Sequence, residues 1–128
     1  MSIRSAMDLI VYQKAYDLAM RVFELSKHFP TEERYALTSQ VRRSSRSVCL
    51  NLREAWAKRR YPAHFVSKLT DCDGENSETE SSLRFALDCG YIDSQTHEAL
   101  LSISREIGQI LGSMIHRPEK FLLRNPHR

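Results

Sequence analysis

Helical periodicity constrains the fold of this chain more than any other feature. Apolar residues recur at steps of three and four along most of the sequence, and the pattern is interrupted near Pro30, Pro62 and Gly90. Such spacing places apolar side chains on one face of an α-helix, and proline and glycine commonly mark helix boundaries. The sequence therefore predicts helices over residues 8–28, 32–58, 62–89 and 94–116, with a tail at residues 118–128.

The expected helix ends support this division. Thr31 is a plausible N-cap for the second helix, Pro62 suits the first turn of the third, and Asp93 or Ser94 can cap the fourth. Gly90 suits the left-handed position that follows a helix. Because the links are short and every helix has an apolar stripe, we predict an all-α, antiparallel up-down four-helix bundle, with the 128 residues forming a single domain. Additional apolar strips predict a homo-oligomer.

The sequence also indicates a cytoplasmic protein without a membrane partner. It contains no apolar run near the roughly 20 residues that a membrane span needs, and no signal-peptide core is recognisable at its start. Three cysteines, an odd number, lie far apart, which favours a reducing compartment over a disulfide framework. We expect Cys49, Cys72 and Cys89 to be small core residues.

Charge is divided between two segments of the chain. Residues 31–60 hold eight basic and three acidic residues, a net charge of +5, whereas residues 61–100 hold two basic and eight acidic residues, a net charge of −6. Within the second helix, arginines recur at steps that keep them on one side. Arginine binds phosphate through its planar fork, so this basic face is a candidate nucleic-acid-binding surface. Its residues are Arg42, Arg46, Arg53, Lys58, Arg59 and Arg60.

Trp56 and Tyr61 lie among these charges and could stack on bases, although a tryptophan on a helix is more often a packing residue. Two simpler interpretations of the arginines stay open, a solvated basic face and ion pairing with the acidic third helix. No recognised DNA- or RNA-binding motif accompanies them.

A structural polar network is the second hypothesis for charged residues. Polar side chains of the second helix need partners if they face inward, and the polar middle of the third helix can supply them. The network would fix the register between the two helices rather than catalyse a reaction. Its expected members are Arg43, Asn51, Glu54, Glu75 and Glu78.

We find no signature of an enzyme, a cofactor or a metal centre. The sequence has no glycine-rich phosphate loop, and neither Glu75 nor Glu78 begins the Glu-x-x-His pair typical of di-iron bundles. The five histidines are expected near helix ends or in the tail, where side chains are usually exposed or capping. They are His28, His64, His97, His116 and His127.

An ordered set of short motifs spans roughly residues 8–121. It comprises Val11-Tyr12-Gln13-Lys14-Ala15; Phe29-Pro30 with Glu33, Tyr35, Ala36 and Leu37; Gln40, Arg42-Arg43, Ser47, Asn51 and Glu54; Ala86 and Gly90-Tyr91-Ile92; and Ile107-Gly108 with Leu111 and Met114. In this order the motifs resemble the 23S rRNA intervening-sequence proteins, which are four-helix bundles. That family is similar to the accessory variability determinant of diversity-generating retroelements, a basic pentamer that binds nucleic acid and partners a reverse transcriptase.

The resemblance implies an antiparallel four-helix subunit that assembles into a homopentamer. Together with the basic face, it predicts a non-enzymatic protein that binds RNA or DNA as an accessory to RNA processing or to a reverse transcriptase. The alternative is a protein-interaction scaffold that does not contact nucleic acid directly and matches its basic face to an acidic protein surface.

Overall fold

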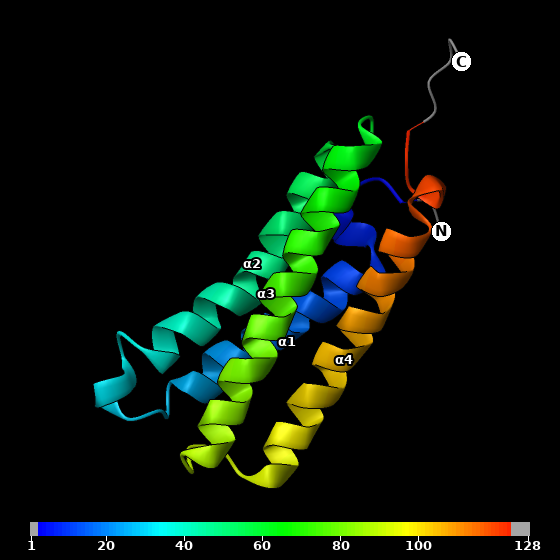
Figure 1. Cartoon of the computed structure of the whole chain (residues 1–128). Helices are drawn as coiled ribbons and strands as arrows, with labels where there is room; N and C mark the ends of the chain where they lie inside the picture. Colours follow the sequence, from blue (N-terminus) through cyan, green and yellow to red (C-terminus); the bar gives the residue numbers. More distant parts are fainter. Residues whose placement is uncertain (1–2, 124–128) are drawn as a thin grey trace.

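Four long helices make up the fold in a computed structural model that describes residues 3–123. They are α1 (Ile10–Ser26), α2 (Leu37–Ala57), α3 (Pro62–Asp88) and α4 (Ser94–His116), and consecutive helices run in opposite directions (Figure 1). Short 3-10 helices lie at Ala6–Asp8 (η1), Thr31–Glu33 (η2) and Pro118–Lys120 (η3). Within the described residues there are no strands, so the prediction of an all-α, four-helix protein is confirmed.

The second helix begins five residues later than predicted. Thr31 does not cap it but opens η2, and α2 starts at Leu37. The Glu33 carboxylate explains this start, because its Oε1 accepts a hydrogen bond at 3.3 Å from the Leu37 N–H, one of the donors that the beginning of a helix leaves unpaired. The N-cap residue of α2 is therefore Ala36 and not Thr31, and the Glu33 carboxylate pairs one of the free N–H groups that follow it.

The other helix boundaries lie within two residues of their predicted positions. Pro62 occupies the first turn of α3, and Gly90, with φ 78°, has the left-handed conformation expected after that helix. Asp93 is the N-cap of α4, and its side chain accepts a hydrogen bond from the Thr96 N–H at 2.7 Å. This bond lowers the pKa of Asp93.

The core fills the space between the four helices. Its most deeply buried large side chains come mainly from α3 and α4, including Phe65, Leu69, Leu83, Ile107 and Leu111. Residues 118–123 extend this packing, since the Phe121 ring lies 6.5 Å from that of Phe65, centroid to centroid. This part of the predicted tail is therefore docked on its own chain, and residues 124–128 lie outside the described part.

A buried layer of neutral polar side chains crosses the middle of the bundle. Ser44 on α2 and Thr79 on α3 share a hydrogen bond of 2.8 Å. Asn76 on α3 is bonded to Ser104 on α4, with its Nδ2 donating to the Ser104 carbonyl at 2.8 Å. Each of these four residues is nearly inaccessible to solvent. The polar middle of α3 thus contacts both neighbouring helices within the core.

Candidate nucleic-acid interface

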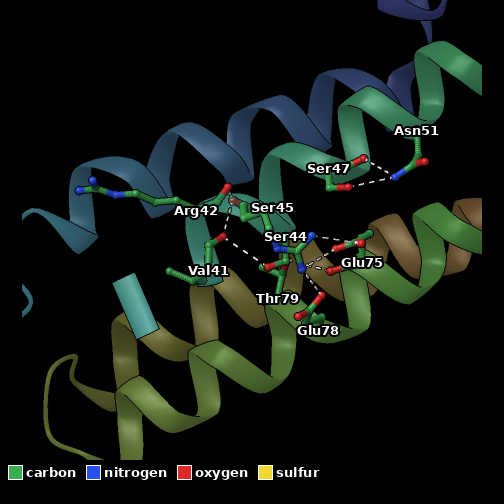
Figure 2. Close-up of polar contacts among 10 residues, drawn as sticks. Val41, Arg42, Ser44, Ser45, Ser47, Asn51, Glu75, Glu78 and Thr79 are labelled. Atoms are coloured by element: carbon green, nitrogen blue, oxygen red, sulfur yellow. Dashed lines mark hydrogen bonds and ion pairs between the residues drawn. The ribbon is translucent and has the colours of Figure 1, made fainter. Parts of the chain in front are cut away.

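Arginine side chains leave α2 in two directions. At about 100° per residue, Arg42, Arg46 and Arg53 lie within about 40° of one another on the helix circumference, whereas Arg43 is turned towards α3. Figure 2 shows Arg42 extending away from the carboxylates of Glu75 and Glu78. The acidic helix therefore neutralises only one side of the basic helix.

Arg43 forms ion pairs with two carboxylates of α3. Its Nη2 lies 2.7 Å from Glu78 Oε2 and 3.4 Å from Glu75 Oε2, and hydrogen bonding to Glu78 and then to Glu75 raises the pKa of Arg43. The Arg43 side chain is nevertheless 56% exposed, so the cluster lies on the surface and not in the core. Charged groups join α2 to α3 at the rim of the bundle, outside the buried polar layer.

Two other expected members of this network have different partners. Glu54 pairs with Lys68 of α3 at 2.6 Å, and Lys68 also pairs with Asp71 at 3.3 Å. Asn51 does not reach α3, since its Nδ2 donates to the carbonyl and hydroxyl oxygens of Ser47, one turn earlier in α2 (Figure 2). The expectation that Asn51 would join the α2–α3 network is corrected accordingly.

Arg42 and Arg46 pack on an aromatic ring of α1. Their guanidinium carbons lie 4.8 and 5.5 Å from the centroid of Phe23, and Lys27 Nζ also lies 4.8 Å from it. Arg42 is held further by its Nε, which donates to Ser26 Oγ at 2.7 Å. Three cationic side chains therefore converge on one ring, an arrangement that favours an incoming anion.

The opposite end of α2 holds a second basic group. Because α2 ends at Ala57, Lys58, Arg59 and Arg60 lie in the turn before α3. Arg59 is stacked 3.6 Å from the centroid of Trp56 and donates from its Nε to the Trp56 carbonyl at 2.8 Å. Partial burial lowers the pKa of Arg59. The basic face thus has three parts: the arginines beside Phe23, the single residue Arg53, and this turn.

Most of these arginines have no acidic partner. Within residues 3–123, no carboxylate lies within 4.0 Å of the cationic nitrogens of Arg42, Arg46, Arg53, Arg59 or Arg60. Arg46, Arg53 and Arg60 are also exposed to solvent. The geometry therefore leaves an accessible line of positive charge along α2, suited to contact with several phosphates.

The comparisons with known proteins place the chain in a family. The profile of the 23S rRNA-intervening sequence protein family matches residues 7–113. The chain belongs to this family. It also resembles a crystal structure of a protein of unknown function from the S23 ribosomal protein family of Bacteroides thetaiotaomicron, with 30% identity and a TM-score of 0.76, covering 84% of this chain and 96% of that one. No curated protein matches the chain significantly.

In this member of the family, sequence reasoning missed the residues that α1 contributes to the basic face. Phe23 belongs to the apolar periodicity of α1, yet it is only half-buried and packs against Arg42 and Arg46. Ser26 and Lys27 follow it on the next turn of α1 or just after it. The i, i+4 spacing of Phe23 and Lys27 could have indicated a cation beside the ring. It could not indicate Arg42 and Arg46, because they belong to α2.

Two predictions about buried and exposed residues were wrong. Cys49 and Cys72 are buried as expected, but Cys89 is exposed because it follows the last residue of α3. His97, expected to be exposed near a helix end, is only 8% exposed and lines a groove of about 420 Å³ between α3 and α4. His127 lies outside the described residues.

The structure adds two observations on metals and membranes. In the part of the chain that it describes, no cluster of three or more histidine, cysteine, aspartate or glutamate side chains is placed to hold a metal ion. Among the same residues, no helix is both long and apolar enough to span a membrane.

Proposed function

We propose that this protein is a non-enzymatic, homo-oligomeric nucleic-acid-binding protein that contacts RNA or DNA through the basic face of α2. The observation that carries the proposal is the exposure of Arg46, Arg53 and Arg60 without an ion-pair partner among residues 3–123. Phosphate contacts of this kind do not depend on base identity, so binding has no sequence preference. The description of the family, which refers to 23S rRNA, supports a role connected with RNA.

Four of the six carboxylates of α3 support this proposal because cations other than Arg42, Arg46, Arg53 and Arg60 engage them. Arg43 pairs with Glu75 and Glu78, Lys68 with Asp71, and Arg84 with Asp88. Ion pairing with the acidic helix, the simplest alternative explanation of the basic face, therefore accounts for Arg43 alone among the arginines of α2. The positive charge that is left over is available to a ligand.

Assembly into a homopentamer is part of the same proposal. Ile10, Tyr16 and Met20 expose large apolar side chains on α1, with Ile10 66% exposed, and a neighbouring subunit could cover them. A few arginine–phosphate contacts on one subunit bind weakly, but identical faces repeated in an oligomer raise the affinity by multivalency, by about 100-fold in suitable geometry. Such an oligomer would act in the cytoplasm as an accessory to RNA processing or to a reverse transcriptase.

The test combines native mass spectrometry with binding measurements. The untagged protein, purified without nuclease, should be a pentamer that carries nucleic acid. The triple variant R46Q/R53Q/R60Q should keep its helical circular dichroism and its oligomeric state but bind a labelled oligonucleotide more weakly. The slope of log affinity against log salt should fall by up to about 3, one for each phosphate contact removed.

A matched control separates the face from net charge. The variant R21Q/R84Q/R105Q loses the same formal charge from α1, α3 and α4, outside the basic face. It should keep the wild-type affinity and salt dependence. If both triple variants lose affinity equally, or if neither does while both stay folded, the assignment of nucleic-acid binding to α2 is wrong.

The alternative function is a protein-interaction scaffold. The exposed aromatic residues Tyr35 and Phe85, which lie outside the basic face, favour it, because such side chains are common in protein interfaces. An oligomer that is free of nucleic acid at low salt, and that recovers one defined protein from its host, would support the scaffold instead.

A further inference from the structure

An aromatic ring accompanies the arginines at each end of the basic face, Phe23 at one end and Trp56 at the other. We call Phe23, Arg42, Arg46, Arg53, Trp56 and Arg59 the arginine–aromatic strip. It contains three cation–π contacts, two on Phe23 at 4.8 and 5.5 Å and one on Trp56 at 3.6 Å. Phosphate binding alone does not need aromatic rings, so their presence indicates a second kind of contact with the ligand.

Hydrogen bonds orient two guanidinium groups of the strip, those of Arg42 and Arg59, before any ligand arrives. Ser26 Oγ donates to the Phe23 carbonyl at 3.0 Å and accepts from Arg42 Nε at 2.7 Å, so the hydroxyl fixes Arg42 beside the ring. The Trp56 carbonyl holds Arg59 in the same way, at 2.8 Å. Ordering a long side chain in advance lowers the entropy lost on binding.

A guanidinium plane that rests on an aromatic ring has a second face on which a base can stack. Arg59 is stacked on Trp56 at 3.6 Å and is partly exposed, whereas Arg46 is exposed and lies 5.5 Å from the Phe23 centroid, within cation–π range. Unpaired bases stack on arginine planes and aromatic rings, whereas the bases of a duplex are already stacked on one another. A single strand can therefore use both the charges and the planes of the strip, and a duplex only the charges.

The length of the strip suits a short single strand. Within α2 the strip runs from residue 42 to residue 56, about 21 Å at about 1.5 Å per residue, a length that corresponds to about six stacked nucleotides at about 3.4 Å each. Arg53 lies between the two aromatic sites on the same side of α2, where it can contact an intervening phosphate.

We infer that the arginine–aromatic strip recognises single-stranded nucleic acid, with bases stacked at Phe23–Arg46 and Trp56–Arg59 and with backbone phosphates on the remaining arginines. This inference rests on the proposed nucleic-acid-binding function and names the form of its ligand. It separates the roles of the arginines, since Arg53 supplies charge and Arg46 and Arg59 supply charge together with a flat surface.

The experiment compares one strand in two forms. A labelled 12-nucleotide RNA without self-complementarity is titrated alone and after annealing to its complement, with anisotropy recorded between 50 and 200 mM salt. The wild-type protein should bind the single strand about 10-fold tighter than the duplex, or more, as expected for one or more stacked bases. The decisive variant is R46K/R59K, which keeps both charges but removes both planar groups.

In R46K/R59K, the affinity for the single strand should fall to that for the duplex, because lysine keeps the charge but has no planar group on which a base can stack. The matched variant R53K changes an arginine that lies over no aromatic ring among residues 3–123, and it should keep the preference. Equal wild-type affinities for the two forms, or a preference that survives in folded R46K/R59K, would overturn the inference but leave the proposed function intact. No binding of either form at 50 mM salt would overturn both.

Discussion

Asn76 and Ser104 form a reciprocal pair inside the bundle, between α3 and α4. Asn76 Nδ2 donates to the Ser104 carbonyl at 2.8 Å, and Ser104 Oγ donates to Asn76 Oδ1 at 3.2 Å. Both residues are buried, with Ser104 completely inaccessible. Because a buried polar group is costly when unpaired, this pair favours one register of α3 against α4.

Replacing Asn76 by alanine should destabilise the protein by about 2–3 kcal/mol, because the change removes both hydrogen bonds and leaves a cavity. The free energy of unfolding from urea titration measures the loss. Ser104→Ala, which removes one bond and less volume, should cost only about 1–2 kcal/mol. If N76A were as stable as wild type, the pair would not hold the two helices in register.

The Arg43 cluster should contribute much less to stability. Its arginine and Glu78 are both largely exposed, and exposed ion pairs typically stabilise a protein by about 0–1 kcal/mol. Arg43→Ala should therefore lower the free energy of unfolding by about 1 kcal/mol or less. The change leaves both Glu78 and Glu75 without their cation, and Glu75, with a side chain only 22% exposed, is the more buried of the two.

A second variant tests that assignment. Adding Glu75→Gln to Arg43→Ala should restore part of the lost stability, because the glutamine carries no charge that needs a partner. If E75Q lowered the free energy of unfolding by the same amount in R43A as in the wild-type protein, the two side chains would not interact.

The three thiols should differ sharply in reactivity. Burial raises the pKa of Cys49 to about 11 and is the main cause that raises the pKa of Cys72 to about 12, whereas Cys89 is exposed. The thiolate is the reactive form, so at pH 8 a disulfide reagent such as DTNB should modify one thiol per folded chain rapidly. Cys89→Ser should remove this fast phase, and unfolding in urea should expose the other two. A fast phase that survives in C89S would contradict the assignment.

The hydrogen bond from Tyr91 to Glu33 predicts a dependence of stability on alkaline pH. The Tyr91 hydroxyl donates to Glu33 Oε2 at 2.8 Å, and this bond is the main cause that raises the pKa of Tyr91 to about 12. A raised pKa means that the folded state keeps its proton when the unfolded state loses it. The stabilisation is therefore complete below pH 10 and is lost as the pH rises from about 10 to about 12.

The comparison with Tyr91→Phe isolates this effect from the other tyrosines. The variant should be less stable than wild type at pH 8, and the difference between the two proteins should shrink between pH 10 and pH 12. Chemical denaturation at each pH measures the difference. A gap that stayed constant over this range would show that the hydroxyl proton does not stabilise the fold.

Local physical rules were sufficient to predict the four helices and several of their ends from the sequence. The repeat of apolar residues at three and four determines which stretches are helical, since only that spacing places them on one face. Pro62, Gly90 and Asp93 acted as their backbone and capping chemistry predicts. The start of α2 was misplaced because residues 31–33 form the separate 3-10 helix η2, and the N-cap residue of α2 is Ala36, whose side chain cannot cap a helix.

The candidate interface was only partly predictable. Helical spacing placed Arg42, Arg46 and Arg53 on one side of α2 and Arg43 on another, because that separation depends on α2 alone. The supporting role of Phe23 and the pairing of Glu54 with Lys68 depend on how α1 and α3 pack against α2. A stripe of apolar residues does not show which of its members lies at the edge of the core.

The sequence by itself determined four amphipathic helices, their approximate limits and a helix rich in arginine, because periodicity, capping and charge are properties of neighbouring residues. Only the tertiary structure decided which arginines are neutralised, which polar residues cross the core and which aromatic rings face the surface. Those outcomes depend on distances between residues far apart in the chain, as from Phe23 to Arg42 or from Asn76 to Ser104, which the packing of the helices sets.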